Sequence, residues 1–286
     1  MEKNKLAGAA QVLAAALLWS SAGLLIRGVD CSTFWLLCIR SGAAALVLAP
    51  GLRALRGKKI GVNGWLAIWL YAAFMFAFAM ATKLAGASQA VAGQYTAPLF
   101  IYAASVLCRK TRVRLSNLAP MLCIAAGCVL SLVAGGVSFL TLLPLSCGVL
   151  FPLYSAFLRR AGDLPAGAVN CLGNLACALL ALPFALTAPL PAVGGAALIA
   201  IAGMAVNGLG YTLYARGARQ VDSLTAVMLC LAEPVLNPVW VFLFLGEAPS
   251  AVGLASLLLI LAGGALDVVI AALRSAGGLR RAGQRG

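Results

Sequence analysis

The chain has 286 residues, of which 63% are hydrophobic and only 10% charged, and its formal net charge is +14. Because a soluble domain is about half apolar and about a quarter charged, this composition excludes an ordinary soluble domain and indicates that lipid is the solvent. The basic residues lie in short segments between apolar stretches without interleaved aromatic residues, which argues against nucleic acid as a partner.

Ten apolar stretches follow one another along the chain, each close to the length of about 20 residues that crosses the hydrocarbon of a bilayer. They cover residues 6–26, 32–50, 65–82, 88–108, 118–134, 138–158, 166–187, 194–215, 224–245 and 251–273. Backbone polar groups in lipid must be satisfied within the segment, so each stretch is predicted to be a helix. The first stretch follows Lys3 and Lys5 as a signal peptide would, but its length favours a transmembrane helix.

The cysteines are unusual in number but not in pattern. Nine are present, mostly inside the apolar stretches and never as a Cys-x-x-Cys pair, and the chain has no histidine. Such cysteines act as small apolar packing residues. We therefore expect no disulfide framework, no metal site and no cofactor.

The basic residues between the stretches predict the topology. With the N-terminus in the cytoplasm, eighteen of the 21 Lys and Arg residues fall in cytoplasmic segments, most densely in 53–59 and 109–114. Arg27 and Lys83 fall outside, and Arg40 lies within a helix. This positive-inside bias predicts a multi-pass protein of the cytoplasmic membrane, with both termini in the cytoplasm and the lipid bilayer as a partner.

The two halves of the chain resemble each other. Residues 83–107 match residues 219–243 when the sequence is shifted by 136 positions. The pairs that meet under this shift are Lys83 and Arg219, Pro98 and Pro234, and Gly127 and Gly263. The pattern predicts one five-helix unit used twice, over residues 1–135 and 136–275, followed by a basic cytoplasmic tail at 276–286.

An odd number of helices per unit determines how the two units are oriented. The second unit enters the membrane from the opposite side, which is the inverted-topology repeat of many secondary transporters. The predicted fold is therefore an all-α integral membrane protein with ten transmembrane helices in two inverted five-helix repeats. Exchange of conformations between such units opens a central site alternately to each side.

Several segments resemble the EamA type of the drug/metabolite transporter superfamily. LAEPVLNPVWVFLFLGEAPSAVGLASLLLILAGGAL at 231–266 reads as the family's ninth and tenth helices. LLWSSAGLLIR (17–27), FWLLCIRSGAAALVL (34–48) and YTAPLF (95–100) match its first half, whereas CRKTRVR at 108–114 lacks the acidic residue usual after the fourth helix. The resemblance covers essentially the whole chain. It implies transport of a small molecule, in a family that includes exporters of amino acids, other metabolites and drugs.

Glu233 is the most informative single residue. It lies near the middle of the ninth stretch, where a charged side chain costs about 2.5–3.5 kcal/mol unless it faces the bundle interior or a wet cavity. Pro234 has no N–H, so a carbonyl one turn earlier, near Leu229 and Cys230, is left free. Glu233 is a candidate for substrate binding and proton coupling, and a structural hydrogen bond to a neighbouring helix is the alternative.

Arg40 lies too deep in the second stretch to reach the interface comfortably. It needs a carboxylate, backbone carbonyls or a substrate anion as a partner. Glu233 is at similar depth, so an ion pair between the two is one hypothesis. The others are a substrate-binding role and a structural anchor.

Further polar and aromatic side chains at comparable depth are candidates to line a pocket, with helix packing as the alternative for each. They are Trp19, Ser20, Gln94, Tyr95, Tyr154, Asn174, Asn207, Tyr211, Asn237 and Trp240. Pro98 and Pro234 are candidate gating kinks, with a static bend as the alternative.

These features favour a secondary transporter that exports an amino-acid-like or drug-like solute by alternating access. Arg40 and Glu233 together would suit a zwitterionic substrate. An enzyme is not expected, because the chain has no His and only Glu233 is an acid at mid-depth. A facilitative channel and a structural membrane protein are the alternatives, although no repeated polar ring is visible. Protons and a second copy of the chain are left open as partners.

Overall fold

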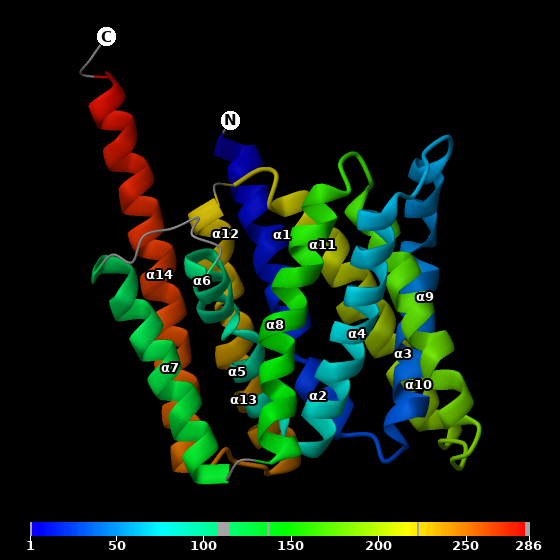
Figure 1. Ribbon diagram of the computed structural model, residues 1–286. Coiled ribbons are helices and arrows are strands. Elements are labelled where there is room, and N and C mark those ends of the chain that lie inside the picture. Colours follow the sequence, from blue (N-terminus) through cyan, green and yellow to red (C-terminus); the bar gives the residue numbers. More distant parts are fainter. Residues whose placement is uncertain (1, 108–114, 136–137, 222, 284–286) are drawn as a thin grey trace.

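The computed structural model describes residues 2–107, 115–135, 138–221 and 223–283 (Figure 1). The predicted basic segment 109–114, the departure from the family pattern at 108–114 and the end of the tail at 284–286 lie outside these residues. The protein is 84% helical and forms no strand in its described part. The all-helical prediction is thereby confirmed.

Every predicted stretch is helical, and several consist of more than one helix. Up to residue 135 the elements are α1 (Glu2–Ser20), α2 (Ala22–Arg27), α3 (Thr33–Leu48), η1 (Ala49–Leu55), α4 (Val62–Leu84), α5 (Ala87–Gln94), α6 (Ala97–Leu107) and α7 (Leu115–Gly135). After it come α8 (Phe139–Arg160), α9 (Ala166–Ala185), α10 (Val193–Ala202), η2 (Gly203–Gly210), α11 (Tyr211–Gly217), α12 (Ser223–Cys230), α13 (Ala232–Leu245) and α14 (Ala251–Gly283).

Eight helical segments of the described chain are long and apolar enough to cross a membrane. They are Asn4–Arg27, Thr33–Leu55, Val62–Leu84, Leu142–Arg160, Ala166–Ala185, Val193–Gly217, Met228–Leu245 and Ala251–Ile270. The predicted fourth stretch is broken between α5 and α6, and α7 contributes a shorter apolar helix at Leu118–Leu130. The count of ten therefore stays a prediction.

Two of the breaks within the stretches lie just before prolines. Pro98 and Pro234 have no N–H to donate to the carbonyl four residues earlier, so the helical ladder is interrupted just before each of them. The interruptions separate α5 from α6 and α12 from α13. They fall at equivalent positions of the sequence repeat, 136 residues apart, so the two halves share this local structure.

The contact between α7 and α14 relates the two halves most directly. A Cβ atom on Gly127 would lie 2.8 Å from the Ser256 carbonyl oxygen, and one on Gly263 would lie 2.7 Å from that of Pro120. Gly127 and Gly263 are equivalent in the repeat, and so are Pro120 and Ser256, because each pair is 136 residues apart. The contact is therefore reciprocal. In Figure 1 the two helices run in opposite directions along it.

The bundle has two unlike ends. Both termini lie at one end, together with the loops after η1 and after α8 (Figure 1). These loops touch, because Lys58 Nζ donates to the Asp163 carbonyl at 2.6 Å. We call this end, which carries Arg53, Lys58 and Arg160, the basic end.

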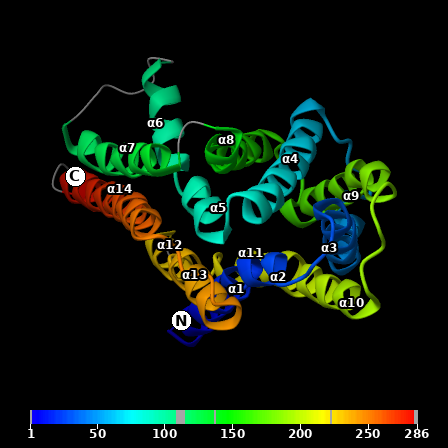
Figure 2. The ribbon, with the colours of Figure 1, turned by 90° about the horizontal axis from the view of Figure 1, so that it is seen from below.

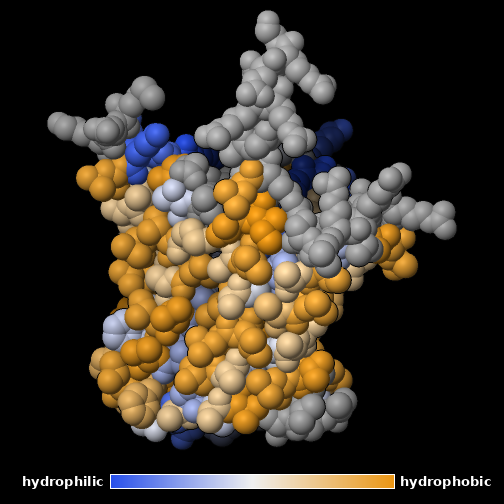
Figure 3. Space-filling view, turned by 90° about the vertical axis from the view of Figure 1, so that its left-hand side faces the viewer, coloured by the Kyte–Doolittle hydropathy of each residue, from blue (hydrophilic) through white to orange (hydrophobic). Residues whose placement is uncertain are grey.

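Apolar side chains cover the surface between the two ends. Figure 3 shows hydrophobic residues across the middle of one face, with hydrophilic residues gathered toward the ends. Leu122, Val129 and Leu258 are each more than half exposed. Exposed large apolar side chains at this density are typical of a lipid-facing surface. The protein is thus a multi-pass membrane protein.

Candidate functional site

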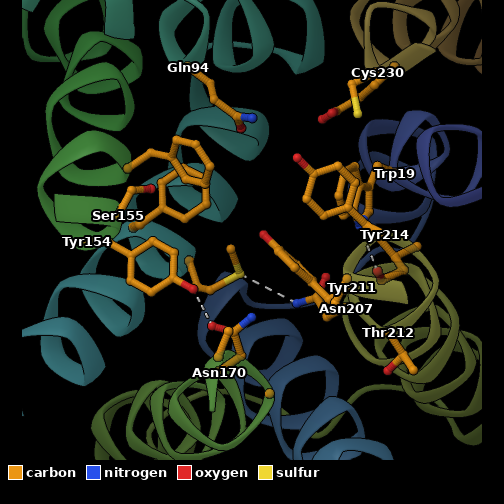
Figure 4. Close-up of a pocket in the computed structure, with 18 of the residues that line it drawn as sticks. Trp19, Gln94, Tyr154, Ser155, Asn170, Asn207, Tyr211, Thr212, Tyr214 and Cys230 are labelled. Atoms are coloured by element: carbon orange, nitrogen blue, oxygen red, sulfur yellow. Dashed lines mark hydrogen bonds between the residues drawn. The ribbon is translucent and has the colours of Figure 1, made fainter. Parts of the chain in front are cut away.

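A cavity of about 1380 Å³ lies among the helices and is lined by both halves of the chain. Figure 2 shows α4, α5 and α8 on one side of the bundle and α1, α2 and α11 on the other. Side chains from both sides line the cavity (Figure 4). Its lining is mainly apolar, with eight aromatic residues, and polar side chains lie among them, which is the usual composition of a small-molecule site.

Most of the predicted candidates meet in this cavity. Those that line it are Trp19, Arg40, Gln94, Tyr95, Pro98, Tyr154, Asn207, Tyr211 and Glu233. Gln94 of α5 and Cys230 of α12 lie on facing walls in Figure 4, and they are equivalent in the sequence repeat. The two broken helices therefore contribute matching positions to one site.

The remaining candidates, Ser20, Asn174, Pro234, Asn237 and Trp240, do not line the cavity. Trp240 Nε1 donates to Ser20 Oγ at 2.9 Å, which fastens α13 to α1. Asn174 Nδ2 donates to the Tyr71 hydroxyl at 3.2 Å and to the Asn170 carbonyl at 2.9 Å. These contacts correspond to the packing alternative, because the side chains point at neighbouring helices instead of the open space.

Asn237 has a different environment from the other excluded candidates. Its side chain is fully buried, and its Oδ1 and Nδ2 atoms have no hydrogen-bond partner. A Cβ on Gly23 would collide with Oδ1, so the glycine is what allows α2 and α13 to approach here.

Glu233 lies in the first turn of α13 and is 7% exposed. The Tyr95 hydroxyl lies beside its carboxyl group and donates to the Cys230 carbonyl at 3.3 Å. This carbonyl is the one that Pro234 leaves without a helical donor, as the sequence predicts. Tyr95 comes from the first half and Glu233 from the second, so the pair joins the two halves at the cavity wall.

Arg40 lies on α3 and is 4% exposed. Its Nε and Nη2 atoms are buried without a hydrogen-bond partner. The ion pair with Glu233 that similar depth suggested does not form: the two side chains make no contact within salt-bridge distance, and Glu233 is not among the ionisable groups that act on Arg40. Depth along a helix does not determine the direction in which a side chain points.

The α3 backbone at Arg40 is held by η2, a π-helical segment. A Cβ on Gly203 would collide with the Arg40 carbonyl, so glycine is required for this close contact. Within η2, the Val206 carbonyl accepts a hydrogen bond from Trp19 Nε1 at 3.1 Å. Asn207 Nδ2 contacts Met75 Sδ at 3.6 Å. π-Helical segments are rare in proteins, but those that occur are often found at functional sites. This one places Asn207 in the cavity.

Several lining residues are not among the candidates that the sequence indicates. They are Gln11, Asn170, Tyr214, Arg216, Arg219 and Gln220, among others. The charge of Arg216 and Arg219 alone predicts a cytoplasmic loop, which says nothing of a cavity. Tyr214 packs against Trp19 in a tilted arrangement with ring centroids 5.2 Å apart, and its three-residue spacing from Tyr211 on the same helix is the signal that could have identified it.

The cavity reaches the basic end, where the exposed Arg216 and Arg219 line it. At the other end the bundle is tied by a set of contacts that we call the Arg27 network. Arg27 Nη2 lies 2.6 Å from Glu247 Oε2, and Arg27 Nη1 donates to the Lys83 carbonyl at 3.1 Å. Lys83 Nζ donates to the Val29 carbonyl at 2.6 Å. The network joins α2 and α4 of the first half to the end of α13 in the second.

Comparisons with known proteins agree with this architecture. The family model described as the EamA-like transporter family matches the chain twice, at residues 6–133 and 134–268. A solved structure, described only as a crystal structure of a protein, resembles it with a TM-score of 0.62 and 25% sequence identity. That similarity covers 94% of this chain and 98% of the other. None of the curated proteins matches the chain.

Proposed function

Because the chain belongs to the EamA-like transporter family, whose members are membrane transporters, we propose that it carries a small metabolite across the cytoplasmic membrane by alternating access, in the direction of export. The observation that carries this proposal is the cavity of about 1380 Å³, which both halves line and which reaches one end of the bundle. A carrier needs such a site, because its substrate must be bound before the exit opens.

The orientation follows from charge. Eighteen of the 21 Lys and Arg residues belong to segments that the ten-helix topology assigns to one side, and basic loops are retained in the cytoplasm. The basic end is therefore the cytoplasmic end, with both termini there. The cavity in this conformation faces the cytoplasm, and the Arg27 network closes the outside.

The two halves, 1–135 and 136–275, act as inverted repeats in this proposal. The reciprocal contact of α7 with α14 supports it, because equivalent glycines occupy equivalent places on helices that run in opposite directions. Exchange of conformations between the halves would break the Arg27 network and close the helices around Arg216 and Arg219. Pro98 and Pro234 lie where α6 and α13 would pivot.

A proton gradient is the energy source that the site supports. Glu233 is buried in the membrane beside Tyr95, and a carboxyl group there is uncharged when it holds a proton. Taking up a proton from one side and releasing it to the other would link substrate movement to the gradient.

The test is flux into proteoliposomes that contain only this protein. Solutes for the assay come from a metabolite screen of cells with and without the protein. A carrier gives a flux that saturates with substrate and that a pH gradient accelerates. A flux that rises linearly with concentration indicates a channel, and no flux for any screened solute indicates a structural protein.

A further inference from the structure

The strongest unexplained feature of the site is the guanidinium group of Arg40. Arginine stays charged at any physiological pH, and a buried charge is destabilising by several kcal/mol unless it is paired. Arg40 is 4% exposed, and its Nε and Nη2 have no hydrogen-bond partner. The ionisable groups that act on it are Cys177, Tyr71 and Tyr211, which are all uncharged at neutral pH.

The charge of the whole cavity also favours a negatively charged ligand. Among its described lining residues, the cations are Arg40, Arg216 and Arg219, and the acid is Glu233. Arg216 and Arg219 lie at the basic end, and Arg40 lies deeper. With Glu233 ionised the lining still has an excess of positive charge, and a positive cleft with apolar walls concentrates anions.

We propose that the cavity binds an organic anion, with its carboxylate or phosphate group on Arg40 and an apolar body against the aromatic walls. A planar guanidinium group offers parallel N–H donors that match these oxyanions, which lysine does not. Tyr211, which acts on Arg40, and the lining residues Phe74 and Phe151 are the aromatic side chains that would contact the body of the substrate. This inference names the substrate class of the transporter proposed above, and it commits to a net negative charge instead of a zwitterion.

The test measures binding to the full-length protein in detergent, which requires no transport. The probes are 3-phenylpropanoate, phenyl phosphate, the neutral 3-phenylpropanamide and the zwitterion phenylalanine, which share an aromatic body. The two anions should raise the melting temperature and quench the tryptophan fluorescence of the protein, to which Trp19 in the cavity contributes. The amide and the zwitterion should do neither at the same concentration. Equal or tighter binding of the amide or of phenylalanine would overturn the proposal.

Variants assign the effect to one residue. Arg40→Gln should weaken binding of both anions about 10- to 100-fold, the loss expected for charge-assisted hydrogen bonds worth about 1.5–3 kcal/mol. Arg40→Lys keeps the charge but loses the paired donors, so its affinity for the anions should lie between that of the wild type and that of Arg40→Gln. Arg53→Gln removes an exposed charge at the basic end and should bind as the wild type does. Unchanged affinity in Arg40→Gln would contradict the assignment to Arg40. If Arg40→Gln does not fold, unchanged affinity in Arg40→Lys would contradict it instead.

The outcomes separate the two proposals. If anions bind through Arg40 but no solute shows saturable flux, the anion site stands and the transport function does not. If a neutral or cationic solute is transported and the anions neither compete nor bind, transport stands and the anion site is wrong.

Discussion

At the scale of single residues, the contact between Glu233 and Tyr95 is where proton coupling would take place. The carboxyl group belongs to the second half, the phenol belongs to the first, and both line the cavity. The free Cys230 carbonyl gives the phenol a second partner, at 3.3 Å. A change of charge on Glu233 would therefore alter a contact between the halves, which is the kind of coupling that a proton-driven carrier needs.

We expect Glu233→Gln to abolish the dependence of transport on pH. Glutamine has nearly the same shape but does not titrate, so the link between proton and substrate is removed. The loss of one charged hydrogen bond, worth about 1.5 kcal/mol or more, should also slow flux by at least about tenfold. The measurement is the initial rate in proteoliposomes from mildly acidic to mildly alkaline pH. Asp163→Asn, an exposed acid in the α8–α9 loop, is the control. A pH profile like that of the wild type would exclude Glu233 from coupling.

The sequence alone predicts how deep a polar residue lies in the membrane, but it does not predict the direction in which its side chain points. Glu233 and its neighbouring proline are recognisable because a charge in an apolar stretch and a missing N–H have local consequences. Ser20 and Trp240 have suitable depth and chemistry, yet they bond to each other across α1 and α13. Arg40 and Glu233 share a depth and line the same cavity, yet they form no ion pair. Such outcomes depend on how distant helices rotate against each other, which no local pattern specifies.

At the scale of helices, the Arg27 network is the contact that must break for the outside to open. Its ion pair joins the end of α2 to the residue after the α13 cap, Gly246, which ends the helix in a left-handed conformation. The side chains of Arg27 and Glu247 are 26% and 45% exposed, so solvent screens their attraction. A pair of this kind is worth about 0.2–1 kcal/mol, enough to bias a conformational equilibrium without locking it.

Removal of this ion pair should favour the conformation open to the outside. Arg27→Gln and Glu247→Gln should each raise the open population by up to about fivefold, the factor that about 1 kcal/mol represents. The double variant should resemble Arg27→Gln, because that change already removes the ion pair, together with the hydrogen bond to the Lys83 carbonyl. The measurement is the rate at which a membrane-impermeant thiol reagent modifies Cys230 from the outside. Additive effects of the two changes would show that Arg27 and Glu247 act separately.

The break positions show what the sequence could predict at this scale. Pro98 and Pro234 indicate where a helix is interrupted, and α5 and α12 end within a few residues before them. The π-helical segment η2 has no such marker. Apart from Asn207, its residues Gly203–Gly210 are apolar like much of the chain, and the close approach of Gly203 to α3 at Arg40 is visible only in the packed structure.

At the scale of the whole molecule, composition and charge determine more than any motif does. Uniformly apolar stretches of about 20 residues, unlike the short alternating strands of a barrel, satisfy their backbone in lipid as helices, and so the all-helical fold follows from the solvent and the pattern. The repeat is a second global constraint. Gly127 and Gly263 are equivalent in the sequence repeat, and they pack reciprocally between α7 and α14. The cavity is the part that sequence could not provide, because it is the space left after all the helices have packed.

The side on which the cavity opens is testable with native cysteines. Cys230 lines the cavity, whereas Cys31 follows α2 at the opposite end, where burial raises the pKa of its thiol. In inside-out vesicles, an impermeant maleimide should modify Cys230 several-fold faster than in right-side-out vesicles, because the basic end faces the reagent. Cys31 should show the reverse preference, measured at mildly alkaline pH so that its thiolate is available. Peptide mass spectrometry identifies each modified cysteine, and Cys230→Ser provides the matched control. Faster modification of Cys230 in right-side-out vesicles would mean that the basic end lies outside the cell, and the cavity would then face the medium instead of the cytoplasm.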